Sequence, residues 1–92
     1  MLPIIWRTKA KNNLRTILDY IGDRNLSAAL DLQGAMEQAT SQLPHHPYLY
    51  RHGRVPGTRE IVVHPNYIVV YRVEIASIEV LAILHSRQQY PR

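Results

Sequence analysis

The chain has 92 residues, of which 46% are hydrophobic; this composition excludes an intrinsically disordered protein and predicts one small globular domain over residues 1–92. No apolar stretch approaches the roughly 20 residues that a helix needs to cross a membrane, and there is no cysteine to form a disulfide or a thiolate metal site. The absence of cysteine suggests a reduced, cytoplasmic setting, and we expect a protein that binds no membrane and carries no cofactor. The net charge of +4 favours acidic partners.

Hydrophobic periodicity predicts one strand and two helices in the first half of the chain. Residues 3–6 are a short apolar run that is typical of a strand. Thr8 is predicted to cap a helix over residues 9–21, in which apolar residues recur on one face. Asn25 is predicted to cap a second helix that extends to Leu43, and its many alanines favour an antiparallel helical hairpin.

A loop and three strands are predicted to follow. Residues 44–57 are rich in proline, glycine and histidine, which indicates a loop; its adjacent histidines lack a third ligand at useful spacing, so no metal site is expected. Three β-branched runs predict strands at residues 58–64, 67–73 and 77–85. The order β-α-α-β-β-β predicts an α+β fold, with the helical hairpin packed on a mainly antiparallel, twisted sheet.

The basic residues of the second half are all of one kind. From residue 51 onward there are six basic side chains against three acidic ones, and all six are arginines. Arginine suits bidentate contact with phosphate or carboxylate. The C-terminal half is therefore the part in which we look for an anionic partner.

The turns between the last three strands predict which residues face each other. A tight turn pairs His64 with Tyr67 and, farther along, Arg59 with Arg72. A second turn pairs Arg72 with Glu79. Two arginines directly opposite each other repel, and Glu79 is expected to neutralise one of them.

This pairing divides the side chains of the three strands between two sheet faces, both apolar in the middle. One face is predicted to hold Arg59, Ile61, Val63, Ile68, Val70, Arg72, Glu79, Leu81, Ile83, His85 and Arg87. The other is predicted to hold Val62, Tyr67, Val69, Tyr71, Val73, Ile78, Val80, Ala82 and Leu84. One helical hairpin covers only one face, so the other is expected to be exposed and to bind a partner.

Three stretches together resemble a known family. They are "HPYLY" (46–50), "GTREIVVHPNYIVVYRV" (57–73) and "VLAILHSRQQYP" (80–91). With the order β-α-α-β-β-β over nearly the whole chain, they resemble the RelE/ParE superfamily of bacterial type II toxin–antitoxin toxins. The G-x-R-E and P-x-Y-x-x-x-Y-R-V patterns, with a basic and aromatic tail after the last strand, are most similar to the ParE branch.

The ParE branch implies a toxin that inhibits growth by binding and poisoning DNA gyrase, without catalysis. It also implies a cognate antitoxin that neutralises the toxin in a hetero-oligomer; an uncovered apolar face and an arginine-rich half suit an acidic, amphipathic segment that folds on binding. The residues that we expect to bind the antitoxin or the target are Arg59, Ile61, Val70, Arg72, Leu81, His85, Arg87 and Tyr90.

The RelE branch implies a different activity, a ribosome-dependent mRNA endoribonuclease. RNA cleavage needs a base, an acid and cations at the phosphate; Arg59, Arg72 and Arg87 could supply the cations, with Tyr90 or His85 transferring protons. We prefer a docking role for the tail, because the ordinary tyrosine pKa of about 10 makes Tyr90 a poor proton shuttle at neutral pH. A further alternative is an inactive toxin-like binding module.

Overall fold

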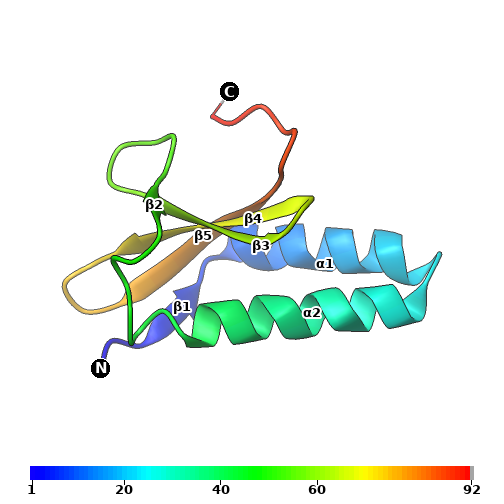
Figure 1. Ribbon diagram of the computed structural model, residues 1–92, viewed down its shortest axis with the longest axis horizontal. Helices are drawn as coiled ribbons and strands as arrows, with labels where there is room; N and C mark the ends of the chain where they lie inside the picture. The colour runs from blue at the N-terminus through cyan, green and yellow to red at the C-terminus, as the bar shows by residue number, and fades with distance from the viewer. Residues whose placement is uncertain (92) are drawn as a thin grey trace.

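Two helices lie side by side on one face of a five-stranded sheet (Figure 1). The computed structural model describes residues 1–91. The elements in chain order are β1 (Ile4–Trp6), α1 (Thr8–Gly22), α2 (Leu26–Ser41), β2 (Arg51–His52), β3 (Arg59–His64), β4 (Tyr67–Val73) and β5 (Ile78–His85). The strand order is β1-β5-β4-β3-β2, with β1 parallel to β5 and every other pair antiparallel. The predicted α+β fold is confirmed, with β2 as an additional two-residue strand inside the predicted loop.

The helix boundaries show which local signals were decisive. Asn25 caps α2 as predicted, because its side-chain oxygen accepts a hydrogen bond from the Ala28 N–H at 3.0 Å. The predicted Thr8 cap is wrong: Thr8 is already the first residue of α1, and the capping position is held by Arg7 without a side-chain hydrogen bond. Neither helix in the described part of the chain is long and apolar enough to cross a membrane.

The strand register agrees with the prediction next to the turns and departs from it farther away. His64 pairs with Tyr67, and Arg72 pairs with Glu79, both as predicted. The pairing of Arg59 with Arg72 is wrong, because the register shifts between Val62 and His64 and Arg59 pairs with Tyr71 instead. An irregularity of this kind places an extra residue in one strand and moves every side chain beyond it to the other face.

A second irregularity has the same effect on β5. Val70 pairs with Ala82 and Tyr71 with Val80, so Leu81 is the extra residue. The predicted faces are therefore right for β4 and for the beginning of β5, and wrong for β3 before the bulge and for the end of β5. The face toward the helices holds Arg59, Ile61, Tyr67, Val69, Tyr71, Val73, Ile78, Val80, Ile83 and His85.

The main core lies between this face and the helices. Its buried members are Ala10, Leu32, Met36 and Leu43 from the helical half and Ile61, Val69, Tyr71, Ile78, Val80 and Ile83 from the sheet. Leu43 lies just beyond the end of α2 and still has no exposed surface. The helices thus cover the middle of the face that Val69, Tyr71 and Val80 share.

The opposite face, which we call the second face, is not bare at its centre. Ile68, Val70, Ala82 and Leu84 form a small cluster there, and each is at most 3% exposed. Tyr90 packs against this cluster, and the C-terminal segment lies on the side of the sheet away from the helices (Figure 1). The expectation of an uncovered apolar face is therefore wrong at its centre, because the chain's own tail covers it.

Candidate functional site

Arg59 is directed into the molecule. Its Nη1 donates hydrogen bonds to the carbonyl oxygens of Tyr48, at 3.1 Å, and Tyr50, at 2.8 Å. Its guanidinium carbon also lies 5.2 Å from the centre of the Tyr48 ring. With these contacts Arg59 holds the loop before β2 against the edge of the sheet.

Tyr71 fixes the same loop from the core. Its hydroxyl donates a hydrogen bond to the Pro47 carbonyl oxygen at 2.6 Å, and the Tyr50 ring meets it edge-on at a centroid distance of 6.5 Å. Burial raises the pKa of Tyr71 to about 12, with the positive charge of Arg59 opposing this shift. At neutral pH this phenol is therefore a hydrogen-bond donor to the loop and not an acid or base.

Glu60, which the sequence reasoning did not single out, is a buried carboxylate on the second face. Arg51 donates to Glu60 Oε1 at 3.0 Å. The Arg54 backbone N–H donates to Oε2 at 3.1 Å, and the Arg54 guanidinium lies 3.5 Å from the same oxygen. Strand alternation was the available signal, because the residue after Arg59 must point to the opposite face. Two of the C-terminal arginines are thus occupied by one internal carboxylate.

Arg72 and Glu79 lie opposite each other in the register but take different charged partners. Arg72 Nε lies close to Glu74 Oε1, although its N–H is not oriented for a hydrogen bond and finds no other partner among residues 1–91. Glu79 instead accepts a hydrogen bond at 2.9 Å from Arg7, which directly follows the neighbouring strand β1. Arg72 remains partly exposed on the second face.

The C-terminal segment is held by contacts along its length. The Ser86 N–H donates to the Asn66 carbonyl oxygen at 2.7 Å, and Arg54 Nη1 donates to the Gln88 carbonyl oxygen at 3.2 Å. Tyr90 then packs on the second-face cluster, with Lys9 Nζ 5.6 Å from its ring centre. The tail therefore forms part of the folded surface.

Two further tail residues lie at the end of β5. His85 is on the helix face, where its ring meets Tyr67 edge-on at 5.6 Å, and its Nδ1 accepts a hydrogen bond from the Arg87 N–H at 3.2 Å. The Arg87 side chain is exposed. A partner could reach Arg87 without any rearrangement of the fold.

The structure does not bring the predicted ribonuclease residues together. Arg59 lies on the helix face and is bound to loop carbonyls, whereas Arg72 and Tyr90 lie on the second face and Arg87 extends from the turn after β5. The predicted contact residues divide in the same way. Ile61 and Val70 are at most 4% exposed, on opposite faces, so a partner reaches them only if covering segments move; Leu81 is partly exposed.

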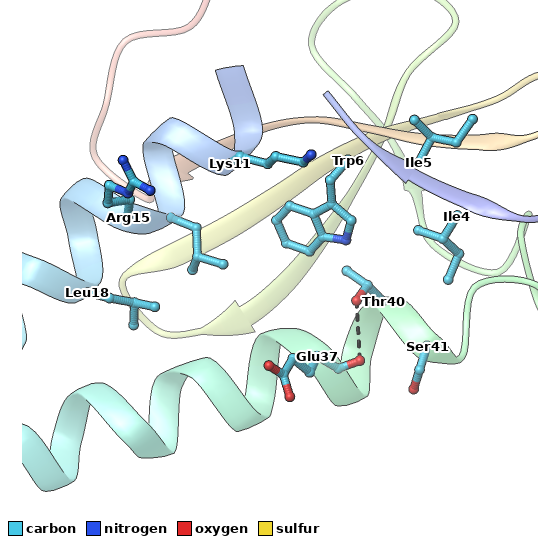
Figure 2. Close-up of a pocket in the computed structure, with 10 residues that line it drawn as sticks. Ile4, Ile5, Trp6, Lys11, Arg15, Leu18, Glu37, Thr40 and Ser41 are labelled. Carbon is cyan, nitrogen blue, oxygen red and sulfur yellow. Dashed lines mark hydrogen bonds between the residues drawn. The ribbon is translucent and has the colours of Figure 1, made fainter. Parts of the chain in front are cut away.

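A groove that the sequence reasoning did not anticipate opens beside β1 (Figure 2). Its volume is about 800 Å³, and it is lined by Ile4, Ile5, Trp6, Lys11, Leu14, Arg15, Leu18, Glu37, Thr40 and Ser41. The Trp6 indole lies in the middle, between Lys11 and Arg15 of α1 and Glu37 of α2 (Figure 2). The signals in the sequence were a short apolar strand and two cations four residues apart, which share one side of a helix.

Comparison with known proteins identifies similar chains. The family model described as the ParE toxin of the type II toxin–antitoxin system, parDE, matches residues 4–90. The putative toxin Y4kP of Sinorhizobium fredii is 32% identical over 90 residues, which cover 97% of this chain and 93% of that protein. Toxin RelE2 of Caulobacter vibrioides is 30% identical over 88 residues, which cover 94% of this chain and 97% of that protein.

Among solved structures, the fold is similar to the chromosomal ParDE toxin–antitoxin system from P. aeruginosa. The TM-score is 0.80 at 21% identity, and the match covers 92% of this chain and 96% of the solved chain. The similarity in structure thus extends over both helices and the sheet.

Proposed function

Because the chain belongs to the ParE family of toxins of type II toxin–antitoxin systems, we propose that it inhibits growth by binding DNA gyrase. In this proposal it acts in the cytoplasm as one domain, without cofactor or catalysis. A cognate acidic antitoxin neutralises it in a hetero-oligomer.

The observation that carries this proposal is the dispersal of Arg59, Arg72, Arg87 and Tyr90. Cleavage of RNA requires an acid, a base and cations at a single phosphate. Here Arg59 holds a loop on one side of the sheet and the Tyr90 ring closes an apolar cluster on the other. This arrangement supports a toxin that acts by binding another protein and not by catalysis.

The surface proposed for the target is the tail together with the neighbouring end of the sheet. It offers the exposed guanidinium of Arg87 beside His85, with the partly exposed Leu81 on the second face. Arg72 lies at the other end of β4, opposite Glu79, and would be a separate contact. The ordered tail lowers the entropic cost of docking, because its backbone is already hydrogen-bonded to the fold.

The test compares two activities of the purified toxin, inhibition of gyrase supercoiling and ribosome-dependent mRNA cleavage. We expect supercoiling to be inhibited and mRNA to remain intact. Tyr90→Phe should retain full activity, because the ring contact is preserved, whereas Arg87→Glu should lower inhibition roughly tenfold by reversing an interface charge. Circular dichroism establishes that both variants are folded.

The similarity to Toxin RelE2 favours a second candidate, the ribosome-dependent endoribonuclease. Under that reading the intact toxin cleaves mRNA on the ribosome, and Tyr90→Phe or Arg87→Glu abolishes the cleavage. If the toxin affects neither gyrase nor mRNA, and cells that produce it grow normally, the chain is instead an inactive binding module.

A further inference from the structure

Two adjoining hollows run along the exposed surface between the two helices. The first is the groove beside β1, which Leu14 and Leu18 of α1 help to line. The second, which we call the tip hollow, has a volume of about 340 Å³ and lies between the end of α1 and the beginning of α2. Leu18 lines both hollows, so the surface is hollowed from β1 almost to the turn that joins the helices.

The two hollows differ in how their apolar side chains are placed. On the α2 side of the tip hollow, Leu26 is 66% exposed and Leu30 is 58% exposed. They are four residues apart, so they lie on the same side of the helix. In the groove beside β1, by contrast, the apolar side chains of Trp6 and Leu14 are half-buried (Figure 2). One end of the hairpin thus presents protruding leucines, and the other presents an apolar groove of about 800 Å³.

The charge along α1 reverses its sign between these two ends. Lys11 and Arg15 border the groove beside β1, whereas Asp19 and Asp23 border the tip hollow. All four side chains belong to exposed residues, and none makes an ion pair within residues 1–91. A uniformly acidic or uniformly basic partner would match only one half of this surface, because the other half would repel it.

We propose that two copies of the free toxin associate through this surface, with their α1 helices antiparallel about a two-fold axis. The pair Lys11 and Asp23 has the same midpoint in the sequence as the pair Arg15 and Asp19. One axis at the level of this midpoint therefore brings each cation of one copy beside a carboxylate of the other.

The same rotation accounts for the apolar side chains. It brings the hairpin tip of one copy over the β1 end of the other, so Leu26 and Leu30 enter the groove that contains Trp6. The surface is thus self-complementary, as a two-fold interface requires. A parallel arrangement would instead place like charges together. This inference goes beyond the proposed function, because it concerns the toxin without any other protein.

The first test is analytical ultracentrifugation of the purified toxin over a wide range of concentrations. We expect a monomer–dimer equilibrium whose Kd rises between about 0.05 and 0.5 M salt, because the ion pairs are screened. Arg15→Asp and Asp19→Arg should each raise the Kd of the dimer roughly tenfold or more, since each places like charges opposite one another in both halves of the interface.

Mixing the two variants gives the sharper result. In a dimer that contains one copy of Arg15→Asp and one of Asp19→Arg, each cation again faces a carboxylate. The equimolar mixture should therefore dimerise about as tightly as the parent. Asp31→Arg is the matched control for Asp19→Arg: Asp31 is also exposed, but it lines a cavity with His64 and Tyr67 beside the turn between β3 and β4. This control should stay within about twofold of the parent.

The second test removes one of the protruding leucines. Leu30→Ser should raise the Kd of the dimer roughly tenfold, because an apolar side chain that enters the groove is lost. Leu49→Ser is the control, since Leu49 is 69% exposed in the loop before β2 and lies outside both hollows. Circular dichroism establishes that every variant is folded.

The outcomes separate the possible occupants of this surface. A parent toxin that stays monomeric at every concentration would overturn the proposal and assign the surface to a different protein. A dimer that keeps its affinity in both single charge variants would use another surface, which also overturns the proposal. Folded variants that remain monomeric when mixed would contradict the antiparallel pairing. Gyrase inhibition is measured separately, so each of these results leaves the proposed function standing.

Discussion

A single buried phenol joins the core to the loop before β2. Tyr71 has no exposed surface, and its hydroxyl donates to the Pro47 carbonyl oxygen, so the loop before β2 is tied to β4. Arg59 holds the neighbouring carbonyl oxygens of the loop from the next strand. At the residue scale, two side chains of the "REIVVHPNYIVVYR" stretch, which carries the resemblance to the toxin family, therefore hold the loop before β2. The bonded loop residues lie nine or more residues earlier in the chain.

The raised pKa of Tyr71 predicts a loss of stability in alkaline solution. Between pH 10 and about pH 12 the unfolded state releases the phenolic proton while the folded state keeps it. The unfolded state then binds fewer protons, so the free energy of unfolding falls as pH rises, by about 1.4 kcal/mol per pH unit from this group. Below pH 10 both states are protonated and the stabilisation is fully present.

The measurement is urea unfolding at pH 8 and pH 11, on the parent and on Tyr71→Phe. The variant should lose about 1 kcal/mol at pH 8, where the hydrogen bond is missing. Its further loss at pH 11 should be smaller than that of the parent. Tyr20→Phe, at an exposed tyrosine, is the control for general alkaline effects. Equal pH dependence in the parent and Tyr71→Phe would show that Tyr71 titrates normally.

At the scale of elements, the C-terminal tail and the segment between β2 and β3 together close the second face. Glu60 fixes Arg51 and Arg54, and Arg54 in turn binds the Gln88 carbonyl oxygen of the tail. Tyr90 then lies on the apolar cluster of β4 and β5. The tail is thus fastened to a buried carboxylate through one arginine.

Truncation of Tyr90 should therefore destabilise the fold, whereas loss of its hydroxyl should not. Tyr90→Ala is expected to cost about 1–2 kcal/mol, less than a fully buried aromatic residue, because the ring is only half-buried. Tyr90→Phe should remain within about 0.5 kcal/mol of the parent. Urea unfolding monitored by circular dichroism measures both. If Tyr90→Ala were as stable as the parent, the tail would contribute nothing to covering the second face.

At the scale of the whole molecule, internal ion pairs decide where the positive charge remains available. Four arginines lie next to carboxylates. Arg7 pairs with Glu79, Arg51 and Arg54 share Glu60, and Arg72 lies beside Glu74. The exposed cations on α1, Lys9, Lys11 and Arg15, have no such partner among the described residues. Exposed positive charge therefore lies on α1 as well as in the arginine-rich C-terminal half.

Binding of the antitoxin, which we propose to be acidic, should raise the melting temperature in a way that depends on concentration and salt. A ligand that binds only the native state, at 100 times its Kd, adds about 2.7 kcal/mol to stability. For a domain of this size that corresponds to about 10–20 °C. The shift, measured by calorimetry, should decrease between about 0.05 and 0.5 M salt, because exposed charges are screened. An unchanged melting temperature would contradict binding to the native fold.

The sequence by itself determined the identity and order of the main elements, the Asn25 cap, and the pairs that lie next to tight turns. These features depend on local periodicity and on residues that are close along the chain. It also indicated the protein family, through motifs in β3 and β4. The sequence also identified the arginines and the tail as candidate functional residues, but it did not predict how they are arranged in space.

Only the tertiary structure decided which face each side chain occupies, what covers the second face, and where the groove lies. The two register shifts fall in "REIVVH" and "IEVLAILH", where apolar residues follow one another without alternation, so no period marks the extra residue. The tail, the Glu60 cluster and the groove join segments that are far apart in the chain, as in the contact of Lys9 with Tyr90, which are 81 residues apart. Such contacts depend on how the strands twist and pack, which local sequence patterns do not encode.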